Sequence, residues 1–469
     1  MRGFADAYLQ KSAIRPPLVE LEPHPHLNII VTIPVYHESG LERCLDSLYQ
    51  RALPGSSRAE VLILINAPIS SPREILEHNQ QTLYNTRTWI RRHHHPGIEF
   101  HVMLDHTFSK SQAGVGTARK ILMDEAIRRF NKVGNADGII ASLDADVVVE
   151  PNYLEALLEH FGVQSEPAGA GADQTKTRKK RSPVEGCAVY FEHPLSVEEG
   201  IDSGLLKPEE AHEVLTPGII DAISRYELHL RYYVHAVRFT GYPYAHHTLG
   251  SAFAVRAHVY CKEGGMNRRE GGEDFYFIQK IAQRGHFSDC VSTRVIPSPR
   301  PSDRVPFGTG PVIRRLTSGG ETMESYDPAL FGMLKQFFSG LEKGFVSAGK
   351  GDWIGSQHKV LQEFLESQEF MGALKEILDN CGSYPAFQKR FWRWFNMFRI
   401  LKFLHFARDH GYPEIPVEIA AAAFLSPDVS SDSDVKARPE DVKAGKTNLK
   451  QLLSLYRLMD RSSSGDHIK

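Results

Sequence analysis

The sequence has no apolar run that approaches the ~18 residues of a membrane-spanning helix. Residues 1–26 also lack the apolar core of a secretory signal peptide. The five cysteines are odd in number and widely spaced, and no two of them form a Cys-x-x-Cys pair. These absences argue against a disulfide framework and against a dithiol redox motif. We therefore expect a cytoplasmic protein in a reducing compartment.

The chain also has little excess charge of either sign. Its 55 Lys and Arg residues and 57 Asp and Glu residues give a formal net charge of −2 at pH 7. This balance gives no reason to expect nucleic acid or an anionic membrane as the main partner. The basic run Lys176–Arg181 is expected in a solvated loop. Hydrophobic residues at 41% and charged residues at 24% are ordinary values for a globular protein.

Short apolar runs alternate with helical patterns over the first 150 residues. Strands are expected at residues 28–33, 61–66 and 98–104, and a fourth within residues 138–149. Pro34 is expected to close the first strand, because proline cannot donate to a central ladder. The alternation predicts an α/β fold with a doubly wound, mostly parallel sheet. Ligands bind such sheets outside the carboxyl ends of the strands.

Polar side chains follow the ends of these expected strands. They are Tyr36, Asn66, Asp105 and the pair Asp144 and Asp146. In extended geometry residues i and i+2 point to one side, so the two carboxylates of the pair would face the same way. Such a pair suits Mg²⁺ or Mn²⁺, which take carboxylate oxygens and complete their coordination with water and phosphate oxygens. The alternative interpretation is an acidic pair that only decorates the surface.

The second half of the chain contributes further candidates. Gly272 precedes Glu273 and Asp274 at the start of an expected helix, where carboxylates are favoured, and a helix cap alone would explain one of the two acids. Arg300 and Arg304 lie in a Pro- and Gly-rich stretch, where they could close over an anion or simply hold a loop in place. The adjacent His246 and His247 are weaker candidates for contact with a substrate.

The pattern predicts four segments. Residues 1–26 form an extension, and residues 27–312 form one domain with a nucleotide-binding half at 27–150 and an acceptor half at 151–312. Residues 313–425 are expected to form a helical domain, and residues 426–469 a linker and a short helix. Within residues 393–408 the polar positions recur every third residue and therefore wind around a helix, which favours packing between helices. Peripheral contact with a membrane or a lipid-linked acceptor stays open.

Four motifs in order resemble those of the family 2 glycosyltransferases of the GT-A fold. The matching segments are Ile33–Glu38, Gly116–Lys120, Asp144-Ala145-Asp146 and Gly272-Glu273-Asp274. The resemblance spans about residues 27–310. It implies transfer of a sugar from a nucleotide diphosphate donor, expected to be a UDP-sugar, to an acceptor hydroxyl of a glycan or lipid-linked molecule, with inversion and with help from Mg²⁺ or Mn²⁺.

The resemblance also implies roles for individual residues. Asp274 matches the family's catalytic base, and Glu273 would orient the acceptor or support that base. Asp144 and Asp146 match the metal-binding motif. The residues implied to contact the nucleotide-sugar donor are Pro34, Tyr36, Glu38, Asn66, Arg119 and Asp144.

The sequence departs from the family pattern in three places. Asn66 stands where many members have Asp, and Lys120 stands where Asn is usual. The Gln-x-x-Arg-Trp signature of processive synthases is absent, which favours the addition of a single sugar. Two other functions stay open: a nucleotidyltransferase on the same type of sheet, and a catalytically inactive module that binds a glycan or a partner.

Overall fold

The computed structural model describes residues 3–49, 53–109, 114–163, 184–268, 271–304, 308–347, 353–425 and 448–462. The chain divides into two compact units. Unit 1 comprises Met1–Ile223, Thr248–Arg315 and Ser464–Lys469, and unit 2 comprises Ser224–His247 and Leu316–Ser463. Two of the expected segments, the basic run Lys176–Arg181 and the linker at residues 426–446, lie outside the described residues.

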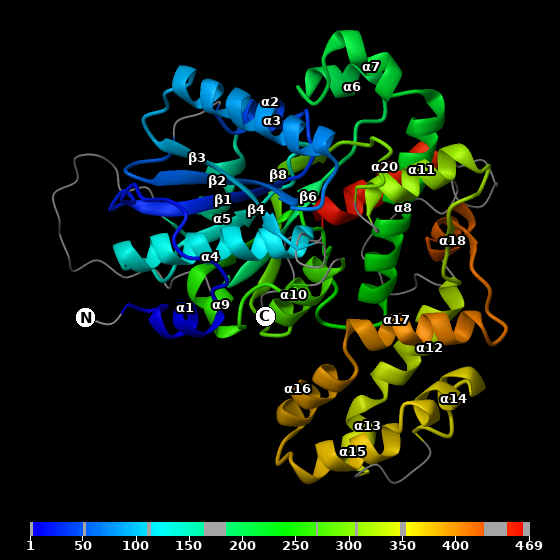
Figure 1. Ribbon diagram of the computed structural model, residues 1–469. Coiled ribbons are helices and arrows are strands. Elements are labelled where there is room, and N and C mark those ends of the chain that lie inside the picture. The colour runs from blue at the N-terminus through cyan, green and yellow to red at the C-terminus, as the bar shows by residue number, and fades with distance from the viewer. Residues whose placement is uncertain are drawn as a thin grey trace. The chain divides into compact units, whose positions relative to one another are not determined.

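Unit 1 is built on an eight-stranded sheet with the order β3-β2-β1-β4-β7-β6-β8-β5 (Figure 1). Strands β3, β2, β1 and β4 are parallel, as are β6 and β8, whereas β7 and β5 run antiparallel to their neighbours. The predicted α/β fold with a mostly parallel sheet is therefore confirmed. The strands are β1 (Leu27–Val35), β2 (Arg58–Pro68), β3 (Ile98–Phe108), β4 (Ile139–Ser142), β5 (Val147–Val149), β6 (Gly186–Phe191), β7 (Phe253–Arg256) and β8 (Phe287–Pro297).

Helices cover both faces of the first four strands. Figure 1 shows α2 (Leu41–Tyr49) and α3 (Arg73–Arg92) on one face and α4 (Val115–Val133) on the other. Each helix follows a strand, because a parallel crossover must return the chain over a sheet face. In α2 the buried side chains, which include Leu41, Leu45 and Leu48, recur at helical spacing and form its inner face.

Pro34 lies inside β1, so the prediction that it ends the strand is wrong. β1 pairs with β2 as far as Val35 but with β4 only as far as Thr32. The carbonyl of Thr32 accepts from the N–H of Leu143 at 3.1 Å, so Thr32 faces the β4 side. Pro34, two residues on, faces the same side beyond the end of that ladder. Its missing N–H therefore removes no hydrogen bond from the sheet.

Asp144 and Asp146 do not lie on an extended strand, contrary to the prediction from their spacing. β4 ends at Ser142, and a short connection with a turn at Ala145 and Asp146 leads into β5 at the edge of the sheet. The ladders of β4 with β1 and with β7 both end at Ser142. The chain is therefore free to turn there, and the two carboxylates reach different partners.

The remaining helices of unit 1 surround the second half of the sheet. They are α5 (Tyr153–His160), α6 (Val197–Asp202), α7 (Pro208–Val214), α9 (Ala257–Lys262) and α10 (Glu273–Ala282). Two helices, α8 (Pro217–Phe239) and α11 (Thr309–Ser318), cross the boundaries between the units.

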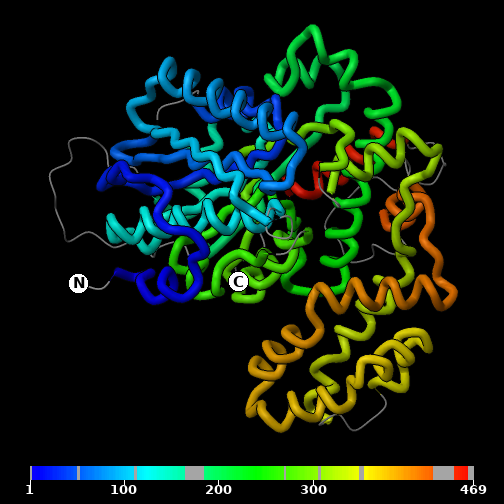
Figure 2. Tube along the Cα trace, viewed as in Figure 1, coloured from blue at the N-terminus to red at the C-terminus, as the bar shows by residue number. Residues whose placement is uncertain are grey.

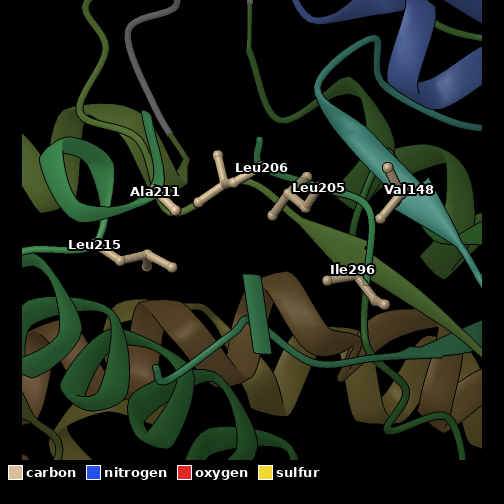
Figure 3. Packing of buried hydrophobic residues seen from close by; sticks show 6 residues of the cluster. All are labelled: Val148, Leu205, Leu206, Ala211, Leu215 and Ile296. Carbon is tan, nitrogen blue, oxygen red and sulfur yellow. The ribbon is translucent and has the colours of Figure 1, made fainter. Parts of the chain in front are cut away.

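An apolar cluster fixes the segment of α6 and α7 to the end of the sheet. Val148 on β5 and Ile296 on β8 are register partners, and Leu205, Leu206 and Leu215 pack with them (Figure 3). Burying a leucine side chain stabilises the fold by roughly 1.5–3 kcal/mol. This cluster therefore fixes the α6–α7 segment to the paired strands β5 and β8.

The N-terminal segment is held along α4. Helix α1 (Asp6–Ser12) lies beside α4, and the chain then runs past α4 to the start of β1 (Figure 2). The N–H groups of Leu18 and Val19 donate to the carboxylate of Glu125 on α4, at 3.0 and 3.3 Å. From Gly3 onward, the described part of this segment is thus packed against α4 through helix α1 and these polar contacts.

Unit 2 is almost entirely helical. Its helices are α12 (Pro328–Ser339), α13 (Leu341–Val346), α14 (Lys359–Ser367), α15 (Phe370–Asp379), α16 (Tyr384–Trp394), α17 (Met397–Arg408), α18 (Val417–Phe424) and α20 (Leu449–Ser462). The strands β9 (Glu324–Ser325) and β10 (Ile415–Pro416) pair antiparallel, although a helical domain was expected over residues 313–425. Two-residue strands are too short to give an alternating pattern. None of the described helices is both long and apolar enough to span a membrane.

Candidate active site

The carboxyl ends of the parallel strands gather the first set of polar residues. Asn66 on β2 and Asp105 on β3 are register partners. Tyr36 follows β1, and Asp144 follows β4 by two residues. Asp105 is already engaged, because Arg15 of the N-terminal segment donates to it at 3.1 Å. The polar side chains at the strand ends therefore lie at one edge of the sheet, as expected. Asp105 pairs there with Arg15 of the N-terminal segment.

Arg119 joins the two acidic motifs. It lies in the first turns of α4 and is only 3% exposed. Its guanidinium donates to Oδ1 of Asp144 and to Oε1 of Glu273, which are far apart in the sequence. Burial opposes the charge, but the two carboxylates prevail and raise the pKa of Arg119. The arginine thus brings the Asp-x-Asp turn and the Glu-Asp helix terminus into one site.

Two further arginines engage a second pair of carboxylates. Arg300 donates to Oε2 of Glu38 at 2.5 Å and lies 3.6 Å from Oδ2 of Asp146. Arg304 donates to the same two carboxylates, at 3.1 Å to Asp146, and to the carbonyl of Tyr36 at 3.3 Å. Glu38 also accepts from the N–H of Gly40 at 2.7 Å. The segment that follows β8 is therefore tied to both the β1 loop and the Asp-x-Asp turn.

Asp146 carries a perturbed carboxyl group. Burial raises its pKa to about 6, and the nearby charges of Glu38 and Asp144 act in the same direction, while Arg304 and Arg300 oppose them. Glu38 behaves differently: although burial raises its pKa, Arg300 and Arg304 hold that pKa below its usual value. The charged form of Asp146 is therefore disfavoured relative to an ordinary aspartate, and its side chain is 31% exposed.

Glu273 and Asp274 occupy the first turn of α10. Gly272 precedes them with a φ of 69°, a left-handed conformation that glycine adopts without strain. Asp274 is half-buried and accepts from the N–H of Phe275 at 2.7 Å. Burial raises the pKa of Asp274 to about 6; Arg119 opposes this shift, and Glu273 adds to it. A carboxylate with this pKa is ionised at neutral pH and can accept a proton.

The donor set at the Asp-x-Asp turn fits a hard divalent cation. Asp144 and Asp146 offer carboxylate oxygens, which are the ligands that Mg²⁺ and Mn²⁺ prefer. The raised pKa of Asp146 reflects first its burial and then the neighbouring charges of Glu38 and Asp144, and a bound cation would offset both effects. The side chains of Asp144 and Asp146 are 37% and 31% exposed, so both are accessible from solvent.

Three of the sequence candidates have other surroundings. Lys120 points away from the acidic motifs, because its Nζ lies 3.1 Å from Asp124 and donates to the hydroxyl of Tyr8 at 3.0 Å. His246 and His247 belong to unit 2, where Nε2 of His247 lies 3.2 Å from Oδ2 of Asp460. Lys120 is therefore a structural residue of α4, and the partner of His247 is an acidic residue of the C-terminal helix.

Sequence reasoning did not identify Gly250 as part of this site. A Cβ at this position would lie 2.6 Å from the guanidinium atoms of Arg119. The backbone at Gly250 therefore forms one wall against Arg119. The sequence does contain a signal for this role, because a glycine at the start of an apolar alternation often marks a place where the backbone lies close to another group.

A different group of possible metal ligands lies elsewhere in unit 1. Among the described residues, ligand atoms of Glu60, Glu99 and His101 lie within 4.8 Å of one another. Glu60 and Glu99 are register partners near the starts of β2 and β3, at the edge opposite to Asn66 and Asp105. Arg129 already binds Glu60, at 2.7 Å to Oε1. Arginines also pair with Asp144 and Asp146, but the side chain of Glu60 is only 2% exposed, whereas those of Asp144 and Asp146 are 37% and 31% exposed, so the Asp-x-Asp turn is more accessible to a cation.

Comparisons with known proteins give a limited result. No family model matches the chain, and neither does any curated protein. A crystal structure of S. aureus TarS 1-349 in complex with UDP-GlcNAc is 12% identical, covers 76% of this chain and 93% of its own, and has a TM-score of 0.36. The mannosyltransferase PcManGT from Pyrobaculum calidifontis in complex with GDP-Man and Mn2+ is 14% identical, covers 87% and 92%, and has a TM-score of 0.33. Similarity at this level supports no conclusion about function.

Proposed function

We propose that the chain is a GT-A-like glycosyltransferase that moves a single sugar from a nucleotide diphosphate-sugar to an acceptor hydroxyl, with inversion and with help from Mg²⁺ or Mn²⁺. The observation that carries the proposal is Arg119, which bonds to both Asp144 and Glu273. This arrangement supports a site in which carboxylates that can hold a metal, and through it a diphosphate, lie close to a carboxylate that can act as a base. This type of transfer requires both.

The residues divide the reaction between them. A cation held by Asp144 and Asp146 would supply Lewis-acid stabilisation of the departing diphosphate. The acceptor oxygen forms a bond to the anomeric carbon as the bond from that carbon to the phosphate oxygen breaks. The acceptor proton passes to Asp274, and the nucleoside diphosphate leaves with the electron pair. We expect Arg300 and Arg304 to bind phosphate oxygens in place of their partners Glu38 and Asp146.

The donor half of the proposal is tested by ligand-induced stabilisation. Nucleoside diphosphates and UDP-, GDP- and other nucleotide-sugars are screened by thermal shift with Mg²⁺, with Mn²⁺ and with EDTA. A ligand that binds only the native state raises its apparent stability, by about 2.7 kcal/mol at a hundredfold excess over Kd. We expect at least one nucleotide-sugar to stabilise the protein only when metal is present. If none does, the enzyme proposal fails.

The acceptor half is tested by Asp274→Asn. This variant should bind the donor with wild-type affinity and lose transfer, because an amide cannot accept the acceptor proton. Asp202→Asn is the matched control, since Asp202 is exposed in the same unit. Full transferase activity in Asp274→Asn would show that the base has been assigned wrongly.

The same experiments separate the two alternatives. A nucleotidyltransferase would release pyrophosphate from a nucleoside triphosphate, and Asp274 would have no evident role in that reaction. An inactive binding module would retain a glycan or a partner without turnover of any nucleotide-sugar. The raised pKa of Asp274, at about 6, supports the transferase over both, because it suits a base that works at neutral pH.

A further inference from the structure

Asn79 has a fully buried amide side chain near the carboxyl ends of β1, β2 and β3. It lies on α3 and is 0% exposed, so it cannot contact a ligand itself. Its neighbour on the helix, His78, is partly exposed. Asparagine is an unusual residue for the buried face of a helix, because its amide must find partners there. The partners of Asn79 are therefore informative.

The amide of Asn79 bonds to three separate segments at the carboxyl edge of the sheet. Its Oδ1 accepts from the backbone N–H of His37, in the loop after β1, at 3.1 Å. Its Nδ2 lies 3.5 Å from the carbonyl of Asn66 on β2 and 3.4 Å from Nε2 of His106 on β3. One side chain thus ties together the ends of β1, β2 and β3.

The contact at His37 holds an unusual backbone. His37 has a φ of 47°, in the left-handed region that residues other than glycine rarely adopt. Its ring packs edge-on against His78, with the ring centroids 4.7 Å apart. The neighbouring Tyr36 and Glu38 are site residues, so the conformation at His37 sets the path of the loop between them. Asn79 supplies the acceptor for the N–H at this point.

The contact at His106 fixes the orientation of a second ring. Burial lowers the pKa of His106, so the imidazole is neutral near pH 7 and one nitrogen can accept a hydrogen bond. With Nε2 accepting from Asn79, the proton lies on Nδ1, which leaves that N–H as a donor. His106 follows Asp105, the register partner of Asn66.

We propose that Asn79 is a positioning residue for nucleoside recognition: it holds the loop at His37 and the ring of His106 where Tyr36, His37 and His106 contact the base and ribose of the donor. This inference rests on the proposed function and adds to it. It assigns nucleoside binding to the phenol of Tyr36 and the imidazoles of His37 and His106, and it assigns their positioning to Asn79. In the proposed function the diphosphate is bound elsewhere, by Arg300 and Arg304 and by the cation that Asp144 and Asp146 would hold.

The test compares a ligand that has a base with one that has none. Calorimetry in Mn²⁺ measures binding of UDP, of GDP and of inorganic pyrophosphate to the wild type and to Asn79→Asp. The carboxylate can still accept from His37 but cannot donate to Asn66 or His106. We expect Asn79→Asp to bind the preferred nucleoside diphosphate about tenfold more weakly. Its affinity for pyrophosphate should stay within about twofold of the wild type.

Kinetics and a double-mutant cycle give a second measurement. Asn79→Asp should raise the KM for the donor and leave kcat nearly unchanged, because the base at Asp274 is untouched. If Asn79 acts through His106, His106→Ala and Asn79→Asp should be markedly non-additive in nucleoside diphosphate affinity. Asn85→Asp is the matched control, because Asn85 is exposed on the same helix, where its Oδ1 accepts from Nε2 of Gln81 at 2.7 Å.

The outcomes are distinct. Equal losses for pyrophosphate and for the nucleoside diphosphate, or no loss for either, would overturn the proposal, and so would additivity with His106→Ala. If Asn79→Asp does not fold, His106→Ala alone must show the same selective loss of nucleoside diphosphate affinity. Failure of the wild type to bind any nucleoside diphosphate while it binds pyrophosphate and Mn²⁺ overturns the proposed function first.

Discussion

Arg119 lies against Gly250 so closely that a Cβ on residue 250 would come within 2.6 Å of its guanidinium carbon. The end of a flexible side chain can usually move aside. Arg119 cannot do so cheaply, because it is buried and bonded to both Asp144 and Glu273. The ion pairs of Arg119 with Asp144 and Glu273 therefore depend on the absence of a side chain at residue 250.

Gly250→Ala should consequently impair activity more than stability. The added methyl group displaces the guanidinium from at least one carboxylate, and we expect kcat/KM to fall by tenfold or more. The loss should be measured by transferase kinetics, with thermal unfolding in parallel. Gly332→Ala is the control, because no atom lies within 4 Å of a Cβ at that position of α12. Full activity in Gly250→Ala would show that catalysis does not depend on the position of the Arg119 guanidinium.

Removal of the Arg119 cation should destabilise the fold. The side chains of Arg119 and Glu273 are only 4% and 3% exposed, so Arg119→Met leaves Glu273 as a buried and uncompensated charge. Breaking a buried pair in this way costs about 3–5 kcal/mol. Urea unfolding should show this loss, and Arg119→Met with Glu273→Gln should recover part of the stability but none of the activity. Equal stability of the single and double variants would contradict the account.

The pH dependence of catalysis follows from Asp274. A base must be deprotonated to act, and the pKa of Asp274 is raised to about 6, so kcat/KM should rise with pH through about 6 and then level off. An unperturbed aspartate would keep activity down to about pH 4. Glu273→Gln removes a neighbouring negative charge that raises this pKa, so the residual activity of that variant should have its midpoint at lower pH. A midpoint that stays in place would argue against Asp274 as the titrating group.

Arg304→Gln should change metal binding and diphosphate binding in opposite directions. Arg304 competes with a cation for Asp146, which it contacts at 3.1 Å, so its removal should tighten Mn²⁺ binding in the absence of nucleotide. The same change removes a phosphate donor, so nucleoside diphosphate should bind about tenfold more weakly. Calorimetry at pH 8 avoids the titration of Asp146. Arg314→Gln on α11 is the control, since Arg314 is 58% exposed, and parallel changes in both affinities would count against this role.

In unit 2, Asp460 should be important for stability. Its carboxylate bonds to Arg231 and lies 2.8 Å from Nε2 of His235 and 3.2 Å from Nε2 of His247, and despite its burial these three neighbours hold its pKa well below the usual value. Asp460→Ala should cost about 3–5 kcal/mol, because Arg231 has 0% exposure. Since the folded pKa is depressed, the contribution is complete above the unfolded pKa of about 3.9 and is lost as the pH falls through the folded value.

Tryptophan fluorescence during urea unfolding measures this effect, because three of the four tryptophans lie in unit 2: Trp353, Trp392 and Trp394. Asp409→Ala serves as the control, since Asp409 is 61% exposed. A loss in Asp460→Ala no larger than in this control would show that the cluster does not stabilise the unit.

The order of strands and helices could be predicted because each leaves a local pattern. Residues 61–66, for example, are an apolar run that becomes the buried core of β2. The place where a strand ends is less local. β4 ends at Ser142 because both neighbouring ladders end there, and no pattern within residues 138–149 reveals where β1 and β7 stop. The same reason applies to Pro34, which is tolerated inside β1 only because β4 is too short to reach it.

The sequence by itself determined the α/β class, the polar residues at the strand ends and the helix that begins at Glu273, because these depend on periodicity and on chemical types along the chain. The tertiary structure alone decided which carboxylates share a cation. Arg119 joins Asp144 to Glu273, and Arg304 joins Glu38 to Asp146. It also decided that Lys120 and His247 belong to other networks. Such pairings depend on distances between segments that are remote in the sequence, and Coulomb energies and pKa values follow those distances and the local burial.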